Sequence, residues 1–226
     1  MNPANRLAQI SFTAGPAALL GGWFLMRPID GDLVPGPWWT AAHAVWLAAF
    51  LMFGLMTLAM RGLAGPLRGG SRVAVEAVTG VALLGVAANV VQLAIDLYAG
   101  FAVADGEAMR ALMEQVKGYP GVELIIYGPG AQVFFAALLV LAVILAVLRR
   151  VTPVSAVVTA GGVVLLAVAT FQEGRGSALV AVGMAVMWLG TLLLGRGPSG
   201  GLGSAATPVG DGATTPARAG EGATTR

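Results

Sequence analysis

The sequence predicts an all-α integral membrane protein, a bundle of six transmembrane helices, and two observations lead to this fold class. The first is composition: hydrophobic residues make up 57% of the chain, charged residues only 11%, and the mean hydropathy is +0.82. Soluble globular domains carry about 25% charged residues, so this composition is typical of a membrane protein. The second is that the apolar residues form long runs, and about 20 apolar residues cross a bilayer as a helix.

Six apolar runs are long enough to cross a bilayer as helices, and together they form one predicted transmembrane domain over residues 1–196. They are Leu7–Met26, Trp38–Met60, Val73–Ala99, Val122–Leu148, Val151–Gln172 and Ser177–Gly195. The segments between them, such as RPIDGDLVPGP and RGLAGPLRGGSR, are rich in Gly and Pro and favour turns. Before the fifth run, Thr152 and Pro153 have the residue types of a helix cap and a first helical turn.

Two segments differ from these runs. In the loop DGEAMRALMEQV, the apolar residues Met109, Leu112, Met113 and Val116 share one helical face. This pattern predicts a short amphipathic helix in the outer loop that follows the third run, packed on the bundle, with a lid over a binding site as the alternative. Residues 197–226 are rich in Gly, Ala, Thr and Pro, so we expect a disordered cytoplasmic tail there.

Basic residues predict the orientation, because positive charge gathers on cytoplasmic loops. One set of helix ends carries Arg6, Arg61, Arg68, Arg72, Arg149, Arg150 and Arg196. The opposite set carries Arg27, Arg110, Lys117 and Arg175. We therefore expect both termini in the cytoplasm and a multi-pass protein of the cell membrane. Aromatic anchors at the outer ends agree with this: they are Trp23, Trp38, Trp39, Tyr98 and Tyr127.

The third run contains a polar stripe within AANVVQLAIDLY. Asn89, Gln92 and Asp96 are spaced by three and four residues, so they share one face of the helix. A carboxylate in hydrocarbon costs about 2.5–3.5 kcal/mol on insertion scales, so it needs a partner, water or a proton. This face of the helix must therefore lie against protein and not against lipid. By helical rise, Asp96 lies about 5 Å and His43 about 7 Å below the outer ends of their helices. Because a short loop makes these two helices neighbours, we expect both groups at matching depth.

The fourth run is interrupted by Gly128-Pro129-Gly130, with Tyr127 and Gln132 on either side. Broken helices expose backbone groups to substrate in transporters, although membrane helices also tolerate proline without any such role. Together with the polar stripe, the break predicts an outer-half polar cavity. The candidate ligand- or proton-binding residues are His43, Asn89, Gln92, Asp96, Tyr127 and Gln132. The alternative is that the amides only join helices, through hydrogen bonds worth about 0.6 kcal/mol each.

Composition also excludes several kinds of chemistry. With no cysteine and one histidine, the chain offers no thiolate site, cysteine nucleophile or multi-histidine zinc site. No nucleophile motif or P-loop is visible, so we expect no catalytic residue, metal or cofactor. Methionine is an ordinary packing residue, and a copper site at Met52, Met56 and Met60 stays open as an alternative, as does a haem held by His43.

Three classes of function remain. The first is a protein that binds or transports a small molecule, ion or proton through the outer cavity. The second is a non-catalytic accessory or assembly subunit of a membrane complex, whose polar groups only lock helices together. The third, an intramembrane enzyme or cofactor carrier, is disfavoured by the composition. The expected partners are the lipid bilayer and either a small-molecule ligand or another membrane protein. The small basic excess does not indicate nucleic-acid binding.

Overall fold

The computed structural model describes residues 3–29, 33–172 and 178–196, and within these ranges the chain is helical without strands. Five helical segments are long and apolar enough to cross a membrane. They are Pro37–Ala64, Gly69–Ala102, Glu123–Val147, Pro153–Thr170 and Ala178–Gly195. The predicted all-α fold, with helices long and apolar enough to span a membrane, is therefore confirmed. The predicted tail at 197–226 and Arg175 lie outside the described residues.

The elements follow one another in a simple order. They are α1 (Pro3–Met26), η1 (Arg27–Ile29), α2 (Pro37–Ala64), α3 (Gly69–Ala102), α4 (Gly106–Lys117), η2 (Glu123–Tyr127), α5 (Pro129–Val147), α6 (Pro153–Gln172) and α7 (Ala178–Gly195). Helix α1 has 24 residues, which is long enough to span a bilayer, but it is less apolar than the five segments above. Its polar and small residues include Gln9, Ser11, Thr13 and Pro16.

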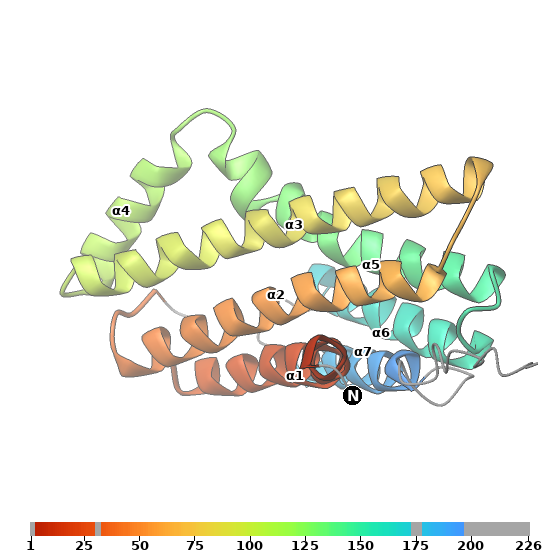
Figure 1. The fold of residues 1–226 in the computed structure, drawn as a ribbon. Coiled ribbons are helices and arrows are strands. Elements are labelled where there is room, and N and C mark those ends of the chain that lie inside the picture. The colour runs from red at the N-terminus through yellow and green to blue at the C-terminus, as the bar shows by residue number, and fades with distance from the viewer. Residues whose placement is uncertain (1–2, 30–32, 173–177, 197–226) are drawn as a thin grey trace, which may run out of the picture.

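Six long helices form a closed ring (Figure 1). Helix α1 packs on α2, α2 on α3, α3 on α5, α5 on α6, α6 on α7, and α7 returns to α1. Neighbours run antiparallel: near the end of α2, Arg61 donates hydrogen bonds to Glu76 near the start of α3. Consequently one end of the ring, which we call the α4 end, contains the last residues of α1, α3 and α6 and the first residues of α2, α5 and α7.

Proline marks the start of four of these helices, and α1 begins at Pro3. Pro37 and Pro129 occupy the first turns of α2 and α5, and Pro153 is the first residue of α6. Proline suits this position because the first helical N–H groups have no partner within the helix. The predicted cap is confirmed, since the Ser155 N–H donates to Thr152 Oγ1 at 3.3 Å.

The half of the ring away from α4 is tightly packed. Phe53, Met56, Met60 and Phe134 are fully buried there, and the Phe53 and Phe134 rings lie 4.9 Å apart. Helix α3 approaches α5 closely because Gly85 has no Cβ, which would lie 2.5 Å from the Phe134 nitrogen. Two of the methionines considered for copper thus belong to the apolar core of the bundle.

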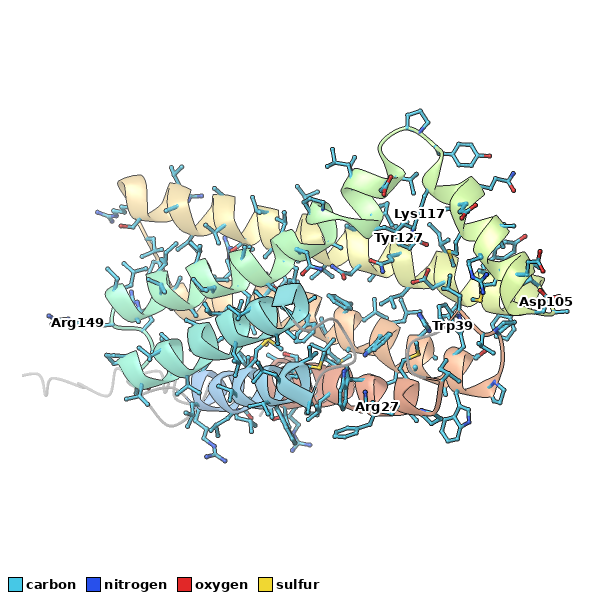
Figure 2. The ribbon with its side chains drawn as sticks, turned by 180° about the vertical axis from the view of Figure 1, so that it is seen from behind. Arg27, Trp39, Asp105, Lys117, Tyr127 and Arg149 are labelled. Atoms are coloured by element: carbon cyan, nitrogen blue, oxygen red, sulfur yellow. The ribbon has the colours of Figure 1, made fainter. Side chains whose placement is uncertain are left out.

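The two ends of the ring differ in charge and in structure. Figure 2 shows Arg149 at one end, which we call the arginine end, and Trp39, Asp105 and Lys117 at the other. Helix α4 begins at Asp105, whose side chain accepts hydrogen bonds from two N–H groups of the first turn. The predicted amphipathic helix is confirmed, because its apolar face buries Met109 and Met113 against the α4 end of the bundle.

Candidate functional site

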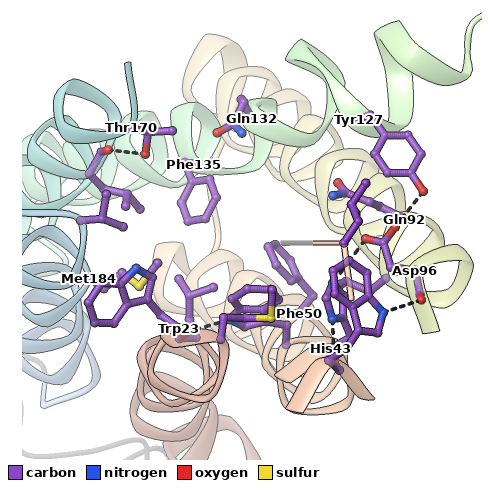
Figure 3. Close-up of a pocket in the computed structure, with 18 of the residues that line it drawn as sticks. Trp23, His43, Phe50, Gln92, Asp96, Tyr127, Gln132, Phe135, Thr170 and Met184 are labelled. Atoms are coloured by element: carbon purple, nitrogen blue, oxygen red, sulfur yellow. Dashed lines mark hydrogen bonds and ion pairs between the residues drawn. The ribbon is translucent and has the colours of Figure 1, made fainter. Parts of the chain in front are cut away.

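A cavity of about 620 Å³ lies inside the ring at the α4 end (Figure 3). Its size falls within the range of small-molecule sites, about 300–1,000 Å³. Its polar lining residues are Arg27, His43, Gln92, Asp96, Lys117, Tyr127, Gln132 and Thr170. Its other aromatic lining residues are Trp23, Trp39, Trp46, Phe50 and Phe135. The cavity therefore combines apolar aromatic walls with a small number of polar groups, as ligand sites usually do.

Two tryptophans of α2 hold the wall of the cavity in place. Trp39 Nε1 donates to the backbone carbonyl of Asp96 on α3, and Trp46 Nε1 donates to the backbone carbonyl of Leu19 on α1, each at 2.9 Å. Glycines on the facing helices make room for both rings. A Cβ at Gly100 would lie 2.6 Å from Trp39 Cδ1, and one at Gly22 would overlap the Trp46 ring. Beside the cavity, α2 is thus hydrogen-bonded to both of its neighbours, α1 and α3.

His43, Asp96 and Tyr127, from α2, α3 and η2, meet at one side of the cavity (Figure 3). Tyr127 donates its hydroxyl hydrogen to Asp96 Oδ1 at 2.9 Å. His43 Nε2 lies 3.8 Å from Asp96 Oδ2, and both residues are about 95% buried or more. The expected proximity of His43 and Asp96 is therefore present in the structure.

The histidine ring is oriented by Trp39. Its Nδ1 lies 2.8 Å from the Trp39 carbonyl, which can only accept, so Nδ1 carries the hydrogen. Nε2 is then the atom that faces Asp96, and it holds a lone pair in the neutral ring or a second proton in the charged one. The Trp39 ring stacks on the imidazole with centroids 3.9 Å apart. The cluster is thus built to hold one proton-exchanging nitrogen beside a carboxylate.

The helix break positions Tyr127. The five residues of η2 form a π-helical turn that ends at Tyr127, and Gly128 separates it from α5, which begins at Pro129. A Cβ at Gly128 would lie 2.8 Å from the Glu123 carbonyl oxygen, so the turn requires the small residue there. π-helical turns occur frequently at functional sites. The predicted interruption of the fourth run is confirmed, and the structure shows that it directs the tyrosine toward Asp96.

The remaining predicted residues divide into two groups. Gln92 and Gln132 line the cavity, with Gln92 half-buried and Gln132 exposed. Asn89 does not line it, because its Nδ2 donates to the carbonyls of Gly85 and Ala131, each at 2.8 Å. The second of these bonds joins α3 to α5. The helix-joining role considered for the amides therefore describes Asn89, while the other five residues come together at the cavity.

Several residues that line the cavity are not among the candidates that the sequence predicts. Trp39, His43, Trp46 and Phe50 are spaced by four, three and four residues, so they share one face of α2. This spacing is a usable signal for a shared face, although Trp39 by itself has only the features of an interface anchor. Contributions from α6 and α7, such as Thr170 and Met184, carry no comparable signal because they are isolated residues in uniformly apolar helices.

Comparison with known proteins adds no further assignment. No protein-family model, curated protein or solved structure matches this chain. Among the described residues, no three histidine, aspartate or glutamate side chains gather as they would around a metal ion. The functional argument therefore depends on the cavity and on the His43–Asp96–Tyr127 cluster.

Proposed function

We propose that this chain is a multi-pass protein of the cell membrane that binds a small molecule in the cavity at the α4 end. The observation that carries the proposal is the cavity itself, about 620 Å³ in volume, with an ionisable cluster on one side and aromatic walls around it. Ionisable groups at membrane depth are costly and are functional sites by default. Helix packing alone requires no such volume next to a buried carboxylate.

The proposed topology has six spans, with α1 as the sixth. Helix α1 closes the ring between α2 and α7, so it lies beside helices that are apolar enough to span. Arginines gather at the arginine end, which the distribution of positive charge assigns to the cytoplasm. The cavity then faces the outside of the cell.

We propose binding and not transport, because packed side chains close the ring between the cavity and the arginine end. Phe50 lines the cavity, and Phe53 and Phe134 beneath it are fully buried in mutual contact. A ligand in the cavity would therefore have access to one end of the ring in this conformation. Transport would require these aromatic residues to separate and reopen the bundle toward the arginine end.

Native mass spectrometry of the protein purified gently from its own membrane tests the proposal. Gln92 lines the cavity, so Gln92→Trp should fill part of it and displace a bound molecule. The neighbouring residue Val91 is exposed on the outside of the bundle and does not line the cavity, which makes Val91→Trp the matched control. We expect a small-molecule adduct on the wild-type protein and on the control, and its loss from Gln92→Trp.

An adduct that persists on Gln92→Trp would refute the cavity as the binding site. A second protein chain that stays bound to all three forms, without any small molecule, would instead favour the accessory-subunit alternative. In that case the polar cluster would serve helix packing, and the function would lie with the partner.

Orientation has a separate test, since the chain contains no cysteine. Single cysteines at Glu114 on α4 and at Arg68 between α2 and α3 sit at opposite ends of the ring, and both positions are exposed. A membrane-impermeant maleimide added to intact cells should label Glu114→Cys, and should label Arg68→Cys only after permeabilisation. The reverse pattern would invert the proposed topology and turn the cavity toward the cytoplasm.

A further inference from the structure

We infer that the ligand of this cavity is a small organic cation with an apolar body, and that Lys117 occupies its cationic position in the unliganded protein. The inference rests on the proposed function and adds the chemical class of the ligand. Three features carry it: the sign of the buried charge, the aromatic walls, and the place of the lysine.

With the His43 ring in its neutral form, the buried charge of the cavity is negative. Asp96 is the only carboxylate among the described residues that line it, and its side chain is 8% exposed. The two lining cations, Arg27 and Lys117, are exposed, so water and salt screen their charges. A carboxylate can accept about four hydrogen bonds. Tyr127 donates to Oδ1, and a ligand ammonium in the cavity would meet the same carboxylate.

The walls suit a cation with an apolar body. Aromatic faces attract cations through their ring quadrupoles, by about 0.5–1 kcal/mol at exposed sites and more where water is excluded. Trp39, Trp46 and Phe50 line the cavity on the same side as Asp96's partner His43, and all come from one face of α2. The protein already contains one cation–aromatic contact in the cavity lining, since the Arg27 guanidinium carbon lies 4.9 Å from the centroid of the Trp23 ring.

Lys117 marks the place of the ligand cation. It is the only lysine in the chain, and its Nζ lies 5.3 Å from the centroid of the Tyr127 ring, whose hydroxyl is bonded to Asp96. The lysine is the last residue of α4, which is attached to the same cluster through Met113, 3.6 Å from the Tyr127 hydroxyl. A ligand ammonium that approaches Asp96 past this ring would compete with the lysine.

The test uses three probes that share one indole body and differ only in the charge of the side chain: tryptamine, tryptophol and indole-3-propionate. Each is titrated by calorimetry into the full-length protein in lipid nanodiscs. We expect tryptamine to bind about tenfold or more tightly than tryptophol, and indole-3-propionate most weakly, because only the ammonium pairs with the buried carboxylate. Equal or tighter binding of either other probe, or no binding of tryptamine, overturns the cationic class.

Two pairs of variants identify the residues involved. Asp96→Asn keeps an acceptor for Tyr127 and should weaken tryptamine binding about tenfold, with tryptophol affinity changed less than about threefold. Glu114→Gln removes an exposed carboxylate at the same end that does not line the cavity, and should leave both affinities unchanged. Unchanged tryptamine affinity in Asp96→Asn contradicts the assignment, and the tryptophol value shows whether the cavity is still folded.

The second pair tests the lysine. Lys117→Gln should raise tryptamine affinity about threefold by removing the competing cation, whereas Arg110→Gln, which removes an exposed cation elsewhere on α4, should not. Lower tryptamine affinity in Lys117→Gln would contradict the competition. The two proposals fail separately: if a neutral or anionic probe binds best and Gln92→Trp abolishes that binding, the cavity remains a ligand site and only the cationic class is lost.

Discussion

Gly85→Ala should destabilise the bundle, because α3 and α5 are in contact at this glycine. The added Cβ would lie 2.5 Å from the Phe134 nitrogen, 2.8 Å from its Cα and 2.9 Å from its Cβ. Non-bonded carbon atoms prefer separations of about 3.5–4.0 Å, so the two helices would have to separate by about 0.5–1 Å at this point. Two of the three atoms are backbone, so no side-chain rotation relieves the overlap.

The magnitude follows from opposing contributions. Overpacking costs about 1–3 kcal/mol, while replacing glycine by alanine inside a helix gains about 1 kcal/mol. Separation of the helices also weakens the Asn89–Ala131 hydrogen bond one turn away, which is worth about 0.6 kcal/mol. The net prediction is a loss of about 1–2 kcal/mol in the free energy of unfolding.

Gly80→Ala is the matched control on the same helix. A Cβ at Gly80 meets nothing within 4 Å, so only the gain in helix propensity remains and stability should stay equal or rise by up to about 1 kcal/mol. Both variants are unfolded by SDS titration from the same mixed micelles, with helical circular dichroism as the signal. Equal stability of the two variants would refute the argument that α3 and α5 are in close contact at Gly85.

Two further predictions concern the cavity wall and the helix contact beside it. Gly22→Ala should displace the Trp46 indole and break its hydrogen bond to α1, seen as a shift of its indole N–H resonance, whereas Gly21→Ala meets nothing within 4 Å. Equal shifts in the two variants would contradict the close fit of the ring. Asn89→Leu should cost about 1 kcal/mol of stability and leave small-molecule binding intact, because Asn89 lies outside the cavity. Lost binding at unchanged stability would show that Asn89 belongs to the binding site.

Features that depend on local pattern could be predicted from the sequence. The apolar runs and their turns predict helices that span a membrane, because helix formation within a bilayer depends on the length and composition of each run. The break at Gly128 and the apolar face of α4 are likewise properties of a few neighbouring residues. The proximity of His43 and Asp96 could be predicted too, since helical rise and a short loop determine the relative depth of two neighbouring helices.

Only the tertiary structure separates Asn89 from Asp96, although both lie on one polar stripe of α3. The two residues are seven positions apart, about two helical turns. At Asn89 the backbone of α5 lies close enough to accept a hydrogen bond, whereas at Asp96 the ring encloses a cavity bordered by residues of α1, α2, α5, α6 and α7. Periodicity along one helix determines which face turns inward. Which groups that face meets depends on how closely the other helices approach at each level, and this is decided by glycines and side chains distant in the sequence.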